Sequence, residues 1–303
     1  FDKVIFPTPY MKMAVVPKAK GDEDKISTAI ARILEEDPTM RYENNAETKQ
    51  MTISGLGDTH LDVIVSKLKN KYGASVELTE ARVPYRETIK KSVQVEGKHK
   101  KQSGGSGQYG HVKITFSPGE AEGLTFTQSV VGGSVPKGYY PAVEKGLLEA
   151  MQKGVLAGFP VVNLAADLFD GSYHPVDSNE ISFKLAAKLA YKEGLPKAGP
   201  VILEPVGSLK VRVPDNLVGD VIGDLNKRRG RVLGMNPDEH GKKYTVVEAE
   251  VPVAEMANYT ISLRAISQGR GSFEFEFARY EEAPANVAQK IIEEAKKLQA
   301  EEE

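Results

Sequence analysis

A short glycine-rich segment is the first place where residue spacing in this sequence suggests chemistry. Residues 105–110 read Gly-Ser-Gly-Gln-Tyr-Gly, and in dinucleotide-binding proteins the spacing G-x-G-x-x-G lies between a strand and a helix whose N-terminus meets the pyrophosphate. Here Val112, Ile114 and Phe116 alternate after the glycines and predict a strand instead. The spacing also fits a kinase glycine loop, but the H-R-D and D-F-G motifs that a kinase needs are missing from this sequence. Nucleotide binding is therefore not expected here.

The residues before this segment are basic. Between Lys90 and Gln102 the only acid is Glu96, whereas the lysines are Lys90, Lys91, Lys98, Lys100 and Lys101. A basic stem attracts phosphate regardless of sequence, and glycines let a backbone approach a partner closely. Tyr109 can stack on an unpaired base and Gln108 can hydrogen-bond one. These features predict an RNA-binding hairpin tip, with an ordinary hairpin tip that binds nothing as the alternative.

A second polar segment, residues 170–180, combines carboxylate, hydroxyl and imidazole side chains. His174, Asp177 and Glu180 lie three residues apart, a spacing that would place them on one face of a helix. A proline and several turn-forming residues predict a loop instead, and no second histidine lies nearby in the sequence. No metal site is therefore expected, and the last polar residues are expected to cap the following helix. A stand-alone enzyme with a site at His174 and Asp177 is the alternative from a different functional class.

Other catalytic patterns are missing from the sequence. It contains neither a G-x-S-x-G elbow nor a G-x-x-x-x-G-K-[ST] phosphate loop, and it has no cysteine. A cysteine nucleophile, a disulfide and a thiolate metal site are excluded, and the composition fits a reducing compartment. His60 lies in what reads as a helix start. We therefore predict no catalytic residue, no metal and no cofactor within these residues.

Charge is distributed unevenly along the chain. Residues 1–82 carry 12 basic and 13 acidic groups, residues 83–203 carry 14 and 11, and residues 204–303 carry 14 and 18. A second basic cluster lies within five residues that contain no acid, and its members are Lys227, Arg228, Arg229 and Arg231. Such a cluster can contact phosphate, although a solvated charged face is the plainer interpretation.

Composition and periodicity indicate a multidomain globular protein. The 303 residues, of which 40% are hydrophobic and 27% charged, suggest two or three domains and contain no run of 18 apolar residues. Residues 1–82 read as strand, helix, strand, strand, helix, strand, which is a split βαβ, ferredoxin-like order. The same order returns after residue 204 and is followed by a final helix from residue 284. We expect an α+β protein with two such domains flanking a different one.

The middle segment, residues 83–203, has a different pattern. Strands are expected at 92–101, 112–116, 124–131 and 161–169, and helices at 142–157 and 181–192. Proline-containing segments mark the two boundaries. We therefore divide the chain into domains at 1–82, 83–203 and 204–303, and place the final helix in the last of them.

Several segments together resemble one known family. Six segments resemble motifs of elongation factor G, the ribosomal translocase, and they occur in the same order along the chain. They are Gly55 to Asp62 (GLGDTHLD), Val83 to Ile89 (VPYRETI), Ser103 to Val112 (SGGSGQYGHV), Asp170 to Ser178 (DGSYHPVDS), Arg228 to Arg231 (RRGR) and Gln268 to Gly271 (QGRG). The resemblance covers nearly the whole chain. It implies the C-terminal part of such a factor, domains III, IV and V, with the GTPase and second domains elsewhere.

This resemblance carries expectations about structure and partners. It implies that domain IV has an unusual βαβ topology, similar to the second domain of a small-subunit ribosomal protein, and acts as a tRNA-mimicking arm. The resemblance assigns RNA contact at the tip of this arm to ten residues, namely Gly104, Gly105, Ser106, Gly107, Gln108, Tyr109, Gly110, Ser172, Tyr173 and His174. Phosphate contact by the stem is assigned to Lys98, Lys100 and Lys101. A less specific part of the resemblance assigns contact with large-subunit RNA to Arg228, Arg229 and Arg231.

The implied function is promotion of tRNA and mRNA translocation at the decoding centre. The implied partners are the RNA of both ribosomal subunits, A-site tRNA and mRNA, with no membrane and no obligate oligomer, in the cytoplasm. GTP and Mg²⁺ are implied for the parent GTPase and not for these residues. The family usually has an arginine where Ser106 stands, and losing that cation removes a possible phosphate contact. This favours considering a diverged paralogue, such as a tetracycline ribosomal protection protein or a translocation-deficient homologue.

Overall fold

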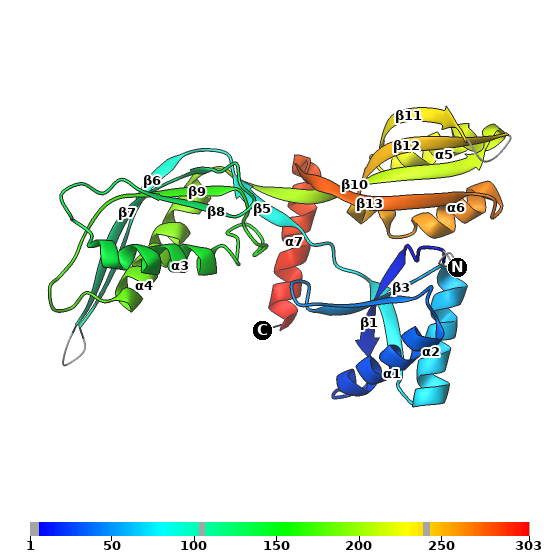
Figure 1. Cartoon of the computed structure of the whole chain (residues 1–303), viewed down its shortest axis with the longest axis horizontal. Coiled ribbons are helices and arrows are strands. Elements are labelled where there is room, and N and C mark those ends of the chain that lie inside the picture. The colour runs from blue at the N-terminus through cyan, green and yellow to red at the C-terminus, as the bar shows by residue number, and fades with distance from the viewer. Residues whose placement is uncertain (1–5, 103–106, 239–242, 303) are drawn as a thin grey trace, which may run out of the picture. The chain divides into compact units, whose positions relative to one another are not determined.

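The computed structural model describes residues 6–102, 107–238 and 243–302 (Figure 1). The chain divides into two compact units, residues 1–84 with 205–279 and residues 85–204 with 280–303. The described residues form two four-stranded sheets and one five-stranded sheet. The structure is therefore α+β, as the sequence predicts.

The first sheet lies in residues 11–80. Its elements are β1 (Met11–Pro17), α1 (Glu23–Glu36), β2 (Arg41–Asn45), β3 (Gln50–Gly55), α2 (Asp58–Tyr72) and β4 (Val76–Glu80). The strand order is β2-β3-β1-β4, which confirms the predicted ferredoxin-like arrangement. Ile26, Ile30 and Ile33 recur at helical spacing on α1 and are fully buried against the sheet.

The Gly55 to Asp62 motif has a structural explanation. His60 Nδ1 accepts the Leu56 amide N–H at 3.0 Å, and His60 Nε2 lies 2.8 Å from Asp37 Oδ2. A Cβ added to Gly55 would lie 2.9 Å from Leu61 Cδ2 and 3.1 Å from His60 Nδ1. The histidine thus links the β3–α2 turn to the end of α1, consistent with the helix start that the sequence indicates.

A second ferredoxin-like arrangement lies near the C-terminus. Its elements are β10 (Pro200–Pro214), α5 (Val218–Lys227), β11 (Arg231–Pro237), β12 (Tyr244–Pro252), α6 (Tyr259–Ser267) and β13 (Ser272–Glu282). The strand order β11-β12-β10-β13 repeats the topology of the first sheet. Alternate residues of β10, namely Leu209, Val211 and Val213, are fully buried.

Strand β10 crosses the division that we place at residue 203. Its first part, Pro200 to Leu203, pairs antiparallel with β5 (Arg86–Ile89). Its second part, Val206 to Pro214, pairs antiparallel with β12. One uninterrupted strand therefore serves two sets of neighbours, which local sequence patterns do not reveal.

The third sheet contains β6 (Val93–Lys101), β7 (Gln108–Pro118), β8 (Leu124–Gln128) and β9 (Leu164–Ser172). The strand order is β6-β7-β9-β8, and β8 runs parallel to β9. A parallel pair needs a crossover connection, which here contains α3 (Tyr140–Ala150). This β8-α3-β9 unit within an otherwise antiparallel sheet is the βαβ topology expected for the middle segment.

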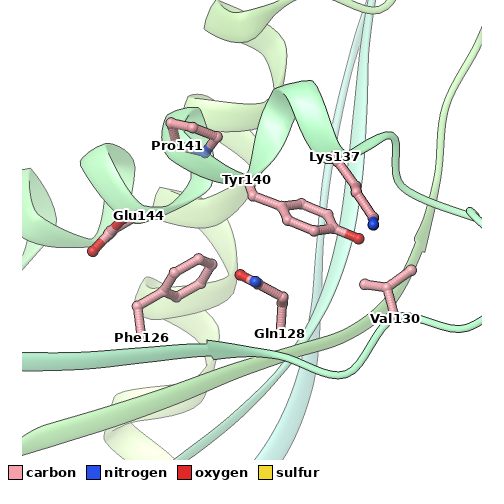
Figure 2. Close-up of a pocket in the computed structure, with 7 residues that line it drawn as sticks. All are labelled: Phe126, Gln128, Val130, Lys137, Tyr140, Pro141 and Glu144. Carbon is pink, nitrogen blue, oxygen red and sulfur yellow. The ribbon is translucent and has the colours of Figure 1, made fainter.

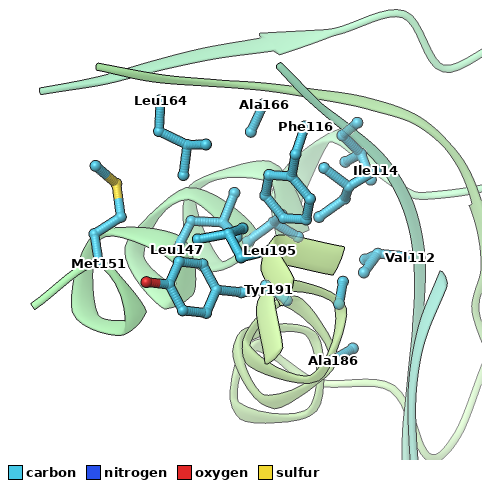
Figure 3. Packing of buried hydrophobic residues seen from close by; sticks show 14 of the residues in the cluster. Val112, Ile114, Phe116, Leu147, Met151, Leu164, Ala166, Ala186, Tyr191 and Leu195 are labelled. Atoms are coloured by element: carbon cyan, nitrogen blue, oxygen red, sulfur yellow. The ribbon is translucent and has the colours of Figure 1, made fainter. Parts of the chain in front are cut away.

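Helices α3 and α4 (Glu180–Gly194) cover one face of this sheet. Figure 3 shows Val112, Ile114 and Phe116 of β7 packed with residues of both helices, such as Leu147 and Tyr191. Alternate residues of each strand enter this core, as the period of two requires. The core therefore fixes which side chains of β6, β7 and β9 remain on the uncovered face.

Helix α3 is shorter than the helix we predict at 142–157, because residues 154–159 bind a buried carboxylate. Glu87, on β5, is 1% exposed and accepts backbone N–H groups of Leu156 and Ala157, both at 2.8 Å, and of Phe159 at 3.2 Å. Burial raises the pKa of Glu87, although these three amides act in the opposite direction. A Cβ added to Gly154 would lie 2.2 Å from the Glu87 carboxyl carbon.

The final helix, α7 (Ala285–Glu302), packs against residues outside the segment where we place it. Its Ile291 and Ala295 are buried in one cluster with Ala157 and Ile202. It therefore belongs to the unit that contains residues 85–204. Among the helices of the described residues, none is long and apolar enough to cross a membrane.

Candidate nucleic-acid interface

The predicted hairpin tip lies at the end of a long two-stranded ribbon. In β6 and β7, Lys98 pairs with His111, Lys100 with Tyr109 and Lys101 with Gln108. Of the predicted tip residues, Gly107, Gln108, Tyr109 and Gly110 lie within the described chain, whereas Gly104, Gly105 and Ser106 lie outside it. Strand β7 begins at Gln108, so a strand follows the glycines, as the sequence predicts.

The two predicted tip loops are joined by hydrogen bonds. Gly107 N–H donates to Asp177 Oδ1 and Tyr109 N–H donates to the Asp177 carbonyl, both at 2.9 Å. The Ser178 hydroxyl donates to the Tyr109 carbonyl, also at 2.9 Å. Segments about 70 residues apart in sequence thus form one polar surface.

A chain of side chains links the strands beneath these loops. The Tyr109 hydroxyl lies 2.7 Å from Ser172 Oγ, which lies 2.8 Å from His111 Nδ1. His111 Nε2 lies 3.4 Å from Glu96 Oε2. Residue types in the sequence predict Tyr109 and Ser172 as tip residues, whereas they do not indicate His111 or Glu96. Their alternation with core residues on β7 and β6 places them on the uncovered sheet face, and only strand register brings them together.

Of the predicted tip residues in the second loop, Tyr173 and His174 have exposed side chains. Tyr173 is 47% exposed, and the His174 ring lies 6.4 Å from the Tyr109 ring, centroid to centroid. His174 Nδ1 accepts the backbone N–H groups of Val176 at 3.3 Å and Asp177 at 3.2 Å. A half-exposed ring with an N–H donor is suited to contact phosphate or a hydroxyl group.

The three predicted stem lysines are exposed. Lys98 Nζ lies 5.7 Å from the centre of the Tyr109 ring, in cation–π geometry. Within residues 6–102, 107–238 and 243–302, no carboxylate oxygen lies within 4.0 Å of Lys98, Lys100 or Lys101. Lys113 differs, because it lies 2.8 Å from Asp170 Oδ2 and lowers the pKa of Asp170 to about 2. The stem lysines therefore carry charge that a phosphate partner could neutralise.

Two glycines of this hairpin let its backbone pack directly against the backbone of α4. A Cβ added to Gly97 would lie 2.0 Å from the Ala186 carbonyl oxygen, and one added to Gly110 would lie 2.4 Å from that of Ser182. The backbone of the ribbon therefore touches the helix backbone. Asn179 caps α4 by accepting the Ser182 N–H at 2.8 Å, so the second loop and the helix that supports the first are continuous in sequence.

Helix α4 is in turn fixed to α3. A Cβ added to Gly146 would lie 2.6 Å from the Lys184 carbonyl oxygen. Glu149 of α3 lies 2.6 Å from both Lys184 Nζ and Lys188 Nζ, and these two lysines lower its pKa to about 2. The tip loops thus rest on a closely packed support, which limits how far they can move independently.

The three arginines of the predicted cluster differ in their hydrogen-bond partners and in their exposure. Arg228 is 15% exposed and donates to Asp224 Oδ2, the Glu255 carbonyl and Ser262 Oγ, at 2.8, 2.6 and 2.7 Å. Arg229 donates to Glu255 Oε1 at 3.0 Å. Arg231 is 63% exposed and pairs with Glu250. Arg231 therefore has the most accessible guanidinium of the three, while Arg228 binds within its own domain.

The two residues of the alternative enzyme hypothesis, His174 and Asp177, do not belong to a larger cluster of reactive groups among the described residues. His174 Nδ1 lies 3.3 Å from Asp177 Oδ2 on the protein surface. Across the described ranges, no three His, Asp or Glu side chains converge as a metal site would require. The stand-alone enzyme hypothesis therefore rests on one exposed pair.

Comparison with known proteins agrees with this arrangement. Family models match residues 6–80 as elongation factor G domain III, residues 81–199 as domain IV and residues 201–291 as the elongation factor G C-terminus. An elongation factor G-like protein of Thermotoga maritima is 48% identical over 299 residues, which are 98% of this chain and 44% of that protein. A crystal structure of a Thermus thermophilus protein superposes with a TM-score of 0.87 and 42% identity, over 97% of this chain and 44% of the other.

Together, the three sheets, the paired tip loops and these matches define part of a translation elongation factor. The chain belongs to the elongation factor G family and carries its domains III, IV and C-terminal domain. It spans less than half the length of the relatives described above.

Proposed function

We propose that this chain is the ribosome-contacting part of an elongation factor G-type translocase. In this proposal the two tip loops of domain IV enter the decoding centre and promote movement of A-site tRNA and mRNA. GTP hydrolysis, with its Mg²⁺, takes place in another domain of the parent protein, and these domains convert that energy into contacts with RNA. The protein acts in the cytoplasm and contacts RNA of both subunits.

The observation that carries this proposal is the joining of the two loops above an unneutralised basic stem. The Asp177 and Ser178 bonds to Gly107 and Tyr109 make one tip from two segments. The close packing of Gly97 and Gly110 against α4 stiffens that tip. A stiff, polar, basic projection is suited to displacing RNA contacts, whereas catalysis would need a pocket with converging reactive groups.

The proposal assigns roles by chemistry. Lys98, Lys100 and Lys101 supply affinity through phosphate, independent of sequence. Tyr109 and His174 offer ring faces and donors to bases or hydroxyl groups, as proteins do when they recognise non-duplex RNA. Asp177 contributes by positioning, because its carboxylate and carbonyl accept hydrogen bonds from the first loop.

Salt dependence of ribosome binding tests the stem assignment. Each phosphate contact contributes about 0.7 to 0.9 to the slope of log K against log salt concentration. Replacing Lys98, Lys100 and Lys101 by glutamine should therefore reduce the magnitude of this negative slope by about 2 to 3. The matched control replaces three exposed lysines of α7, namely Lys290, Lys296 and Lys297. Equal slopes for the two triple variants would refute the phosphate role.

A further inference from the structure

A groove lies in domain IV on the side of the sheet that carries α3. It has a volume of about 580 Å³ and is lined by Phe126, Gln128, Val130, Lys137, Tyr140, Pro141 and Glu144. Figure 2 shows the side chains of β8 and of the segment after it on one side, and those of α3 and of Lys137, just before α3, on the other. None of these residues belongs to the tip loops, so the proposed function does not explain the groove.

The strand that borders the groove has an open edge. β8 is the terminal strand of the order β6-β7-β9-β8, so within the described sheets the backbone groups on its outer side have no strand partner. Natural proteins usually protect such edges with charged residues or proline. The opposite edge strand, β6, carries Glu96 and several lysines, whereas β8 reads Leu-Thr-Phe-Thr-Gln and carries neither charge nor proline. β8 is therefore the edge suited to accept another strand.

Apolar side chains continue from β8 into the next loop. Val131 is 84% exposed. The two residues after it, Gly132 and Gly133, both have φ of +72°, a region that side-chain-bearing residues rarely adopt. The loop conformation thus depends on these glycines and presents valine to solvent next to the groove.

Two charges of opposite sign mark the two ends of the groove. Figure 2 shows Lys137 on the side of Val130 and Glu144 on the side of Phe126. Both side chains are exposed, and neither has an ion-pair partner among the residues that the structure describes. The helical rise from residue 137 to 144 is roughly 12 Å. Four residues of an extended strand span about 13 Å.

We propose that this groove binds an extended protein segment that adds a strand to the free edge of β8. The segment carries an acid, an apolar residue and a base at alternate positions, so that these reach Lys137, the aromatic centre of the groove and Glu144, respectively. Antiparallel pairing is the commoner arrangement of strands and runs the segment from the Val130 end to the Phe126 end. The acid therefore precedes the base by four residues in the partner.

The chemistry of the groove favours protein over RNA as the partner. One lysine balanced by one glutamate offers no net attraction to phosphate. Unpaired backbone N–H and C=O groups in a row match the backbone of another strand. An RNA oligonucleotide bound at these residues would overturn the proposal.

Two blocked heptapeptides test the proposal with the full 303-residue chain. The first is Thr-Glu-Thr-Leu-Thr-Lys-Thr and the second exchanges Glu and Lys. Titration followed by amide chemical shifts should show perturbations at Thr125 to Gln128, with the first peptide binding about three- to tenfold more tightly. That range follows from two exposed ion pairs. A version of the first peptide methylated at alternate backbone nitrogens, in both registers, should lose binding because it cannot pair with an edge.

Charge exchange on the protein supplies the matched variant. Lys137→Glu with Glu144→Lys alters only exposed side chains, and its melting temperature should equal that of the parent chain. It should reverse the preference, so that the second peptide binds about three- to tenfold more tightly than the first. An unchanged preference would overturn the proposal, as would no binding of either peptide, undiminished binding of the methylated versions, or shift changes confined to the tip loops.

Discussion

Replacing Gly97 by alanine tests how rigidly domain IV supports its tip. The added Cβ would lie 2.0 Å from the Ala186 carbonyl oxygen and 2.6 Å from Ala190 N. An ordinary carbon–oxygen contact is about 3.3 Å, so the ribbon and α4 must separate by about 1.3 Å. Both clashing atoms are backbone, which no rotamer change can move. Overpacking of this kind costs about 1–3 kcal/mol, and we expect the upper part of that range.

Local unfolding is the appropriate measurement, because a chain of two compact units need not unfold in one step. Hydrogen exchange across a urea series should show β6, β7 and α4 of Gly97→Ala opening at a midpoint lower by about 1 M. Amides of Gly107 and Tyr109 should exchange faster, because α4 continues directly from the loop that binds them. The matched control is Gly123→Ala, where an added Cβ meets nothing within 4 Å.

The control variant should stay within about 0.5 kcal/mol of the parent chain. Opening of Gly97→Ala and Gly123→Ala at the same urea concentration would show that the close contact between the ribbon and α4 does not support the tip. Destabilisation of α4 in Gly97→Ala with unchanged exchange at Gly107 and Tyr109 would likewise contradict the prediction, because the tip would then be independent of its support.

Two further predictions concern buried groups. Glu87→Gln should destabilise unit 85–204 by about 1–3 kcal/mol, because the glutamine N–H₂ would face backbone donors that the carboxylate now satisfies. Since burial raises the pKa of Glu87, its contribution to stability is full below the ordinary value of 4.5 and is lost as the pH rises through the raised value. The urea midpoint of the parent chain should therefore fall relative to that of Glu87→Gln over that window, and a parallel course would contradict the raised pKa. Arg228→Ala should destabilise the C-terminal domain by about 2–3 kcal/mol, because it removes three hydrogen bonds from a mostly buried guanidinium. The dependence of ribosome binding on salt concentration should stay unchanged. A weaker salt dependence would show that Arg228 contacts phosphate.

Local periodicity was sufficient to predict most elements of this protein. The recurring isoleucines of α1 and the alternating Leu209, Val211 and Val213 of β10 indicated the correct element types, because burial of one face leaves a repeat in the sequence. The two ferredoxin-like domains follow from element order alone. The early end of α3 could not be predicted, because it depends on Glu87, which lies more than 60 residues before the loop that binds it.

Some residues of the candidate site could likewise be predicted from the sequence, and others could not. The glycine loop, the lysine stem and the second loop are recognisable by residue type, so the sequence predicted Tyr109, Ser172 and His174 as tip residues, and their role in RNA binding stays a prediction. His111 and Glu96 were missed. Their side chains reach the tip only because of the registers in which β6 pairs with β7 and β7 pairs with β9. A register shift of one residue would turn either side chain to the other face of the sheet.

The sequence by itself determined the element types, the repeated topology and the family, because these are recorded in local residue patterns, in the order of the elements and in several short motifs along the chain. The tertiary structure decided which loops touch, which glycines carry backbone contacts, where α7 packs and which edge of the domain IV sheet is left open. Those features depend on distances between segments far apart in the chain. Only the folded backbone, with its registers and crossover, sets such distances.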